Sequence, residues 1–246
     1  MPQRMLYGIF SVTVQPAFAP AVRSEVVHFK SKGRARIACD DRSPRPAECL
    51  EETMRYESAI DREILKRPVS LLILAVSFLI FLYIRGGKTE KEKLSRARQA
   101  GCYDREAIRC GQIWRLLTVG FTHIQPWHIA VNLCSLYNLS FLETVYGPIW
   151  YSLILLTAIA AGSLLEYLIS DTRYSVGLSG GLYGLMMSWF LVGLSTGSIR
   201  IRSVLLTLIL NFGINFAPGI AWQAHIGGAL SGLLLTEIMI WVRMLS

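Results

Sequence analysis

The chain has 246 residues, of which 52% are hydrophobic and only 17% charged, whereas a typical soluble domain carries about 25% charged residues. Residues 116–246 contain just four arginines and four acidic residues, too few to cover the surface of a water-soluble domain, which excludes that class for this half of the chain. The net charge of +8 comes from the first 115 residues and forms no basic stripe along a folded domain, so no nucleic-acid partner is expected.

Residues 1–68 form a hydrophilic N-terminal tail without helical or strand periodicity. Its first part, residues 1–20, resembles a short signal peptide, because Arg4 precedes an apolar run that ends in Ala17-Phe18-Ala19. Pro20 argues against cleavage directly after this site, and the lack of acidic residues also suits an organelle transit peptide. Whether the segment is removed therefore stays open.

Long uncharged runs dominate residues 69–246. The first run, residues 69–84, is slightly short of the roughly 20 residues that a spanning helix needs, but Tyr83 and Arg85 suit a membrane interface. None of the runs alternates between apolar and polar residues as a barrel strand does, so we expect helices. The sequence predicts an all-α polytopic membrane domain with six spanning helices, at about 69–85, 125–145, 149–170, 178–196, 202–216 and 220–243.

A charged linker, residues 86–114, joins the first two predicted helices. It contains Cys102 and Cys110, two of the five cysteines of the chain. These two residues either form a disulfide, if the linker faces an oxidising compartment, or are free thiols. No Cys-x-x-Cys pair is present, so zinc or thiol redox chemistry lacks its usual spacing, and we expect no metal and no cofactor.

Four polar residues lie where polarity is costly, in the first turns of predicted membrane helices: His128, Asn132, Ser179 and His225. His128 and Asn132 are four residues apart and share a helix face. The helices concerned are the second, fourth and sixth. Because even-numbered helices of an antiparallel bundle start from the same side of the membrane, the four side chains are predicted to meet at one face.

These residue types indicate acyl transfer. A serine hydroxyl becomes a strong nucleophile when a base removes its proton, and a neutral histidine is the usual base near pH 7. Ser179, at a helix N-terminus, lies beside free backbone N–H groups, and His128 and the Asn132 amide could add donors for an oxyanion. The sequence therefore predicts a Ser179–His225 dyad, with Tyr183 packed against the imidazole.

Two other schemes fit less well. Gly177-Leu178-Ser179-Gly180-Gly181 matches the nucleophile elbow of α/β-hydrolases, but no acidic residue lies between Ser179 and His225, so that triad is excluded. A small-solute transporter or metal carrier could use the same histidines, but the chain shows no inverted repeat. Taken singly, each polar residue is explained by helix packing, and only their convergence favours a site.

His123, Trp114 and Arg115 are interpreted as interfacial residues, although Arg115 could instead brace the linker.

The segment from about 65 to 243 resembles the rhomboid intramembrane serine proteases. The resemblance rests on four pieces in order: Gly111-Gln112-Ile113-Trp114-Arg115, the segment from His123 to Asn132, Gly177-Leu178-Ser179-Gly180 with Tyr183, and Ala224-His225-Ile226-Gly227-Gly228 with Gly232. It implies a six-helix rhomboid-like bundle, with the linker beside it as a membrane-embedded loop.

The resemblance also implies roles. Ser179 would be the nucleophile, His225 the general base, and His128, Asn132 and Ser179 the oxyanion hole, while Tyr183 would stack on His225. The supporting positions would be Gly177, Gly180, Gly228, Gly232, Trp114 and Arg115.

The implied function is cleavage of transmembrane segments of membrane protein substrates, in contact with the lipid bilayer. The alternative is a non-proteolytic rhomboid-like protein that binds transmembrane clients in trafficking or degradation. We expect an integral multi-pass protein of endomembranes or the plasma membrane, with an organelle membrane as the alternative. Substrate, oligomeric state and the role of the tail are left open by the sequence.

Overall fold

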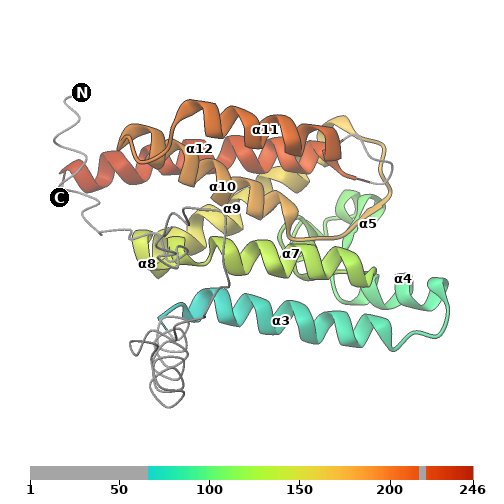
Figure 1. Ribbon diagram of the computed structural model, residues 1–246. Coiled ribbons are helices and arrows are strands. Elements are labelled where there is room, and N and C mark those ends of the chain that lie inside the picture. The colour runs from blue at the N-terminus through green and yellow to red at the C-terminus, as the bar shows by residue number, and fades with distance from the viewer. Residues whose placement is uncertain (1–65, 216–219, 246) are drawn as a thin grey trace, which may run out of the picture. The chain divides into compact units, whose positions relative to one another are not determined.

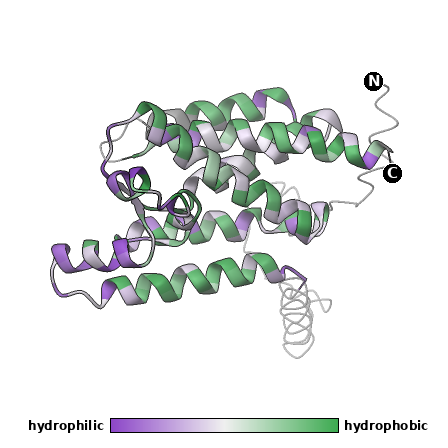
Figure 2. Cartoon of the chain, turned by 180° about the vertical axis from the view of Figure 1, so that it is seen from behind, coloured by the Kyte–Doolittle hydropathy of each residue, from purple (hydrophilic) through white to green (hydrophobic). Residues whose placement is uncertain are grey.

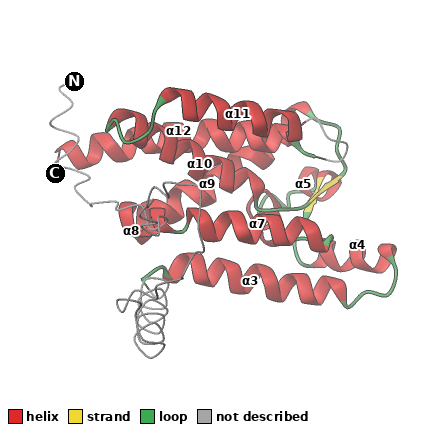
Figure 3. Cartoon of the chain, in the orientation of Figure 1, coloured by secondary structure: helices red, strands yellow, loops and turns green. Residues whose placement is uncertain are grey.

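The computed structural model describes residues 66–215 and 220–245, most of which are helical (Figure 3). The tail predicted for residues 1–68, with its targeting segment at 1–20, lies almost entirely outside the described residues. Each of the six predicted helices has a counterpart, and the second is divided at Ser140. They are α3 (Pro68–Arg85), α7 (Pro126–Leu139) with α8 (Phe141–Tyr146), α9 (Pro148–Ile169), α10 (Ser179–Ser195), α11 (Ile201–Asn215) and α12 (Trp222–Leu245).

Three helices in the described residues are long and apolar enough to cross a membrane. α3 has 18 residues with a mean hydropathy of 2.2, α9 has 22 residues with 1.9, and the segment Trp222–Met244 of α12 has 23 residues with 1.5. The others are shorter, with 14 residues in α7, 17 in α10 and 15 in α11. Helix length and composition thus support an integral membrane protein, and six complete crossings stay a prediction.

Proline and glycine residues mark several helix boundaries. α3, α7 and α9 each have a proline at the first position of the helix, where the missing N–H has no intrahelical partner to lose. Between α8 and α9, Gly147 has a φ of +80°, which favours glycine, and Pro148 follows at once. The chain therefore turns at Gly147-Pro148, between α8 and α9.

The helices α9, α10 and α12 form the centre of the molecule. α12 packs against both α9 and α10, α9 packs against α10, α7 contacts α10, and α3 contacts α7. In Figure 1, α3 lies at the bottom, α7 above it, and α11 and α12 at the top. The buried core that these helices share includes Leu136, Tyr151, Ile154, Leu155, Leu185 and Met239.

The linker between α3 and α7 has more structure than the sequence predicts. It contains α4 (Glu90–Gln99), β1 (Tyr103–Asp104), α5 (Arg105–Arg109), α6 (Arg115–Thr118) and the 3₁₀ turn η1 (Val119–Phe121), and it is markedly hydrophilic along α4 (Figure 2). β1 pairs antiparallel with β2 (Tyr174–Ser175), a short strand that precedes α10. The expected all-α fold therefore holds apart from this two-stranded pair.

Cys102 and Cys110, which the sequence leaves either paired or free, are both free thiols in the structure. Cys102 is buried and Cys110 exposed, and neither is in a disulfide. Burial raises the pKa of Cys102 to about 12. The spacing in sequence left both states open because the position of the two side chains depends on how α4, β1 and α5 fold.

Candidate active site

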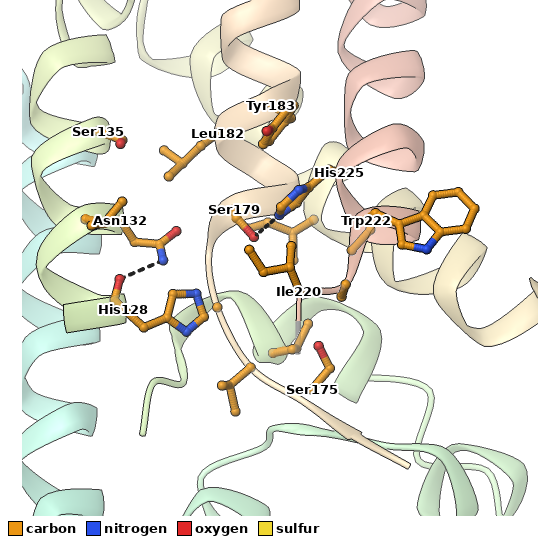
Figure 4. Close-up of a pocket in the computed structure, with 18 of the residues that line it drawn as sticks. His128, Asn132, Ser135, Ser175, Ser179, Leu182, Tyr183, Ile220, Trp222 and His225 are labelled. Atoms are coloured by element: carbon orange, nitrogen blue, oxygen red, sulfur yellow. Dashed lines mark hydrogen bonds between the residues drawn. The ribbon is translucent and has the colours of Figure 1, made fainter. Parts of the chain in front are cut away.

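Three helices begin at one cavity of about 1000 Å³. These are α7, α10 and α12, which supply the four polar side chains that the sequence places in first helical turns. Figure 4 shows them converging from separate helices. The predicted residues that line the cavity are His128, Asn132, Gly177, Ser179, Gly180, Tyr183 and His225.

Ser179 and His225 are in hydrogen-bond contact. The distance from the Ser179 Oγ to the His225 Nε2 is 2.8 Å (Figure 4). Ser179 is the first residue of α10, and His225 lies in the first turn of α12, where its side chain is 8% exposed. A proton can pass directly between hydroxyl and imidazole at this distance.

Tyr183 covers one face of the imidazole. Its ring lies 4.3 Å from the His225 ring, centroid to centroid, with an angle of 12° between the planes. Because Tyr183 follows Ser179 by four residues on α10, both side chains lie on the helix face that looks toward His225. The stacking limits rotation of the His225 ring.

His128 lies against the backbone just before Ser179. Gly177 has a φ of +125°, and a Cβ atom built on it would come within 2.7 Å of the His128 Cε1. Any side chain at Gly177 would displace this imidazole from the cavity wall. One turn further along α7, the Asn132 amide donates a 2.9 Å hydrogen bond to the His128 carbonyl, so the two side chains line the cavity from one helix face.

Glycines let the site-bearing helices approach closely. A Cβ atom on Gly180 would lie 3.1 Å from the carbonyl oxygen of Ala224, the residue before His225. Gly228 faces the Gly180 backbone and Gly232 faces the Gly184 backbone, with no room for a side chain at either position. Gly228 and Gly232 lie outside the cavity lining, so they support the site through the contact between α10 and α12.

Trp114 and Arg115 lie away from the cavity. The Arg115 guanidinium donates to Gln112 Oε1 at 2.7 Å and to the carbonyls of Arg98 and Cys102 at 2.9 and 3.0 Å. It also lies over the Trp114 ring, 4.6 Å from its centroid. Arg115 is buried, so its interpretation as an interfacial anchor is wrong and the alternative, bracing of the linker, describes it.

The interpretation of His123 as an interfacial residue is also wrong. It is fully buried, and its ring makes an edge contact with the His128 ring, with centroids 5.2 Å apart. Burial and, to a smaller extent, the neighbouring His128 lower the pKa of His123 to about 3. His128 also stacks on Trp127. The two histidines are only five residues apart, which is the one indication in the sequence of a contact between them. Their contact depends on the turn before α7, which the sequence does not reveal.

Glu166 is a cavity residue that the sequence analysis overlooked. It lines the same cavity from α9, together with Ser163. The signal was an acidic residue inside an otherwise apolar helix. Within the described residues, no group of three or more His, Cys, Asp or Glu side chains is arranged to hold a metal ion.

Comparison with known proteins matches this region to one family. The model of the Rhomboid domain matches residues 110–242. RHOMBOID-like protein 1 of Arabidopsis thaliana is 35% identical over 131 residues, which cover 50% of this chain and 34% of that protein. RHOMBOID-like protein 6, mitochondrial, of the same species is 30% identical over 154 residues, 59% of this chain and 50% of that protein.

An animal relative matches a longer segment. Rhomboid-related protein 2 of Mus musculus is 24% identical over 207 residues, which cover 75% of this chain and 68% of that protein. The matched part of this chain spans half or less of the length of the plant relatives. Because the Rhomboid domain covers more than half of the chain and includes the helices that line the cavity, the protein belongs to the rhomboid family.

Proposed function

We propose that the protein is an intramembrane serine endopeptidase that cuts membrane proteins within or beside a transmembrane segment. The observation that carries this proposal is the 2.8 Å contact between the Ser179 Oγ and the His225 Nε2 inside a cavity sunk among apolar helices. Helix packing alone would not require a hydroxyl and an imidazole from α10 and α12 to meet at the wall of a large cavity.

The first chemical step is attack of the Ser179 oxygen on a substrate carbonyl carbon. His225 takes the serine proton at Nε2 and then donates it to the departing amine, which leaves an acyl group on Ser179. Water, deprotonated by the same imidazole, cleaves this ester and restores the hydroxyl. Tyr183 keeps the His225 ring in the orientation that serves both transfers.

The tetrahedral intermediate carries a negative oxygen that needs donors. The first N–H groups of α10 have no partner within the helix, and the dipole of α10 favours negative charge at this end. His128 and Asn132 line the opposite wall and are proposed to contribute side-chain donors. Removal of one such donor typically lowers the rate by about 100- to 1000-fold.

The proposal places residues 69–246 in the membrane as one domain with six crossings. The cavity then admits water from the face at which α7, α10 and α12 begin, while the apolar parts of the helices beyond the cavity close its floor. Endomembranes or the plasma membrane are the favoured compartments. An organelle membrane is the alternative, because one plant relative carries "mitochondrial" in its name.

Labelling with a fluorophosphonate probe tests the chemistry directly. The probe is expected to form an adduct at Ser179 in membranes that contain the full chain, and Ser179→Ala and His225→Ala are expected to abolish it. A reporter with a membrane-spanning segment should be cleaved by the unaltered protein and by neither variant. Reporter cleavage that survives Ser179→Ala contradicts the proposal, and a folded protein without labelling or cleavage supports the non-proteolytic alternative.

A further inference from the structure

Glu166 is a buried carboxylate that the proposed reaction does not use. Its side chain is 1% exposed, and its Oε1 atom has no hydrogen-bond partner in the described part of the chain. A buried carboxylate oxygen without a partner carries a large desolvation cost. Glu166 also lines the active-site cavity, so its Oε1 atom can accept a hydrogen bond from a ligand in that cavity.

Helix geometry relates Glu166 to the dyad. Gly162 of α9 packs against the carbonyl group of Ala224, the residue next to His225. Glu166 follows Gly162 by four residues, so it lies on the same face of α9, about 6 Å further along the axis. Side chains on a helix lean toward its N-terminus, which directs the carboxylate back toward the level of His225.

Ser175, at the cavity wall, hydrogen-bonds the Glu166 side chain, whereas Ser163 and Arg105 are engaged elsewhere. The Ser163 hydroxyl donates to the Ile159 carbonyl at 2.9 Å. Arg105, a cation at this end of α9, donates from Nη1 to the carbonyls of Tyr167 and Ser170 at 2.7 and 2.6 Å. None of the ion pairs among the described residues includes Glu166. Within residues 66–215 and 220–245 the carboxylate therefore has no counter-ion.

We propose that Glu166 forms an acidic subsite of the cavity, which binds a lysine or arginine side chain of the substrate next to the scissile peptide bond. The inference rests on the proposed protease function. A basic side chain has a long apolar stem, which suits the apolar cavity wall, and a charged end that can reach past the dyad to Glu166. Basic residues are common beside membrane-spanning segments, where such a protease would cut.

Reporters that differ only at the residue on the acyl side of the cleaved bond test the subsite. The unaltered protein is expected to cleave the lysine reporter faster than the leucine reporter, and the glutamate reporter slowest. Because a hydrogen bond to a charged group is worth more than a neutral one, Glu166→Gln is expected to lower the lysine-to-leucine rate ratio by about 10- to 100-fold. Glu237→Gln is the matched control, since Glu237 is an exposed carboxylate on α12 outside the cavity lining, and it should keep the ratio.

A pair of phosphonate probes with an ammonium or a methyl group at the end of the same side chain gives a second measurement without membrane substrates. The ammonium probe should label Ser179 faster, and Glu166→Gln should remove this advantage. An unchanged preference in a variant that still reacts with the methyl probe overturns the subsite. Should Glu166→Gln fail to fold, Glu166→Asp, which keeps the charge, must keep the preference or the inference is wrong. Absence of labelling by either probe in the unaltered protein instead overturns the protease function itself.

Discussion

The ring of Tyr183 lies almost parallel to the imidazole of His225, with centroids 4.3 Å apart. This contact fixes the base of the proposed dyad from the helix that carries the nucleophile. Tyr183→Ala is expected to lower the rate of reporter cleavage by about 2- to 10-fold, because stacked aromatic pairs are worth about 0.5–1.5 kcal/mol. Tyr183→Phe keeps the ring and should retain more activity than Tyr183→Ala. Equal rates in these two variants would show that the stacking contributes nothing.

Close contact between α10 and α12 should determine the stability of the site. A Cβ atom on Gly232 would meet the Gly184 backbone, which cannot move aside as a flexible side chain can. Gly232→Val is therefore expected to lower the free energy of unfolding by about 1–3 kcal/mol, the usual cost of overpacking. The control is Leu230→Val, at an exposed position of the same helix. Unfolding in mixed detergent micelles, followed by tryptophan fluorescence, measures both variants, and similar losses would contradict this account.

Much of the site could be predicted because local rules place its residues. Ser179 and Tyr183 share a helix face by their spacing, and the order of helices puts the starts of α7, α10 and α12 at one end. These rules require only helix periodicity and alternating direction through a membrane. The structure accordingly brings Ser179, His225 and His128 to one cavity, as the sequence predicts.

Other features depend on contacts between distant segments, which a single sequence does not reveal. Arg115 is buried because the carbonyls of Arg98 and Cys102 surround its guanidinium, and that cluster exists only after α4 and β1 have folded. His123 is buried because the chain turns before α7 and presses its ring against His128. Arg115 and His123 are polar residues near helix ends, and such residues commonly lie at the membrane interface. The sequence alone therefore favours an interfacial position for both.

Glu143 joins the start of α3 to α8 across more than 70 residues of chain. Its carboxylate accepts hydrogen bonds from the backbone N–H groups of Val69 and Ser70, each at 2.8 Å, and from the Ser70 hydroxyl at 2.7 Å. Glu143→Ala leaves these buried donors unpaired and is expected to cost about 1–3 kcal/mol of stability. Hydrogen exchange should increase at the first turn of α3. Exchange that stays as slow as in Glu237→Ala, a carboxylate replacement on an exposed face, would contradict the assigned role.

The two linker cysteines should differ sharply in reactivity. Cys110 is exposed, whereas Cys102 is fully buried and burial raises its pKa to about 12, so almost no thiolate forms there at neutral pH. In variants that keep only one cysteine, a maleimide should label Cys110 within minutes at pH 7 and label Cys102 only after denaturation in detergent. Equal labelling in the folded state, or a disulfide detected in the unaltered chain without reductant, would overturn the assignment of two free thiols.

His123 should make the protein less stable in mild acid. Its pKa is lowered to about 3 in the folded state by burial and by the neighbouring His128, whereas an unfolded chain has a histidine pKa of about 6.5. Above pH 6.5 neither state binds the proton, so His123 has no effect on the pH dependence. Between about pH 6.5 and pH 3 only the unfolded state binds it, and the free energy of unfolding should fall by up to about 1.4 kcal/mol per pH unit.

His128 and His225 titrate as well, so the measurement compares the unaltered protein with His123→Gln. The free energy of unfolding of each is measured in mixed micelles at several pH values, and the two slopes against pH are compared. A smaller slope in His123→Gln is expected, because the variant lacks the group that the unfolded chain protonates, and equal slopes would show that His123 takes up its proton in the folded protein.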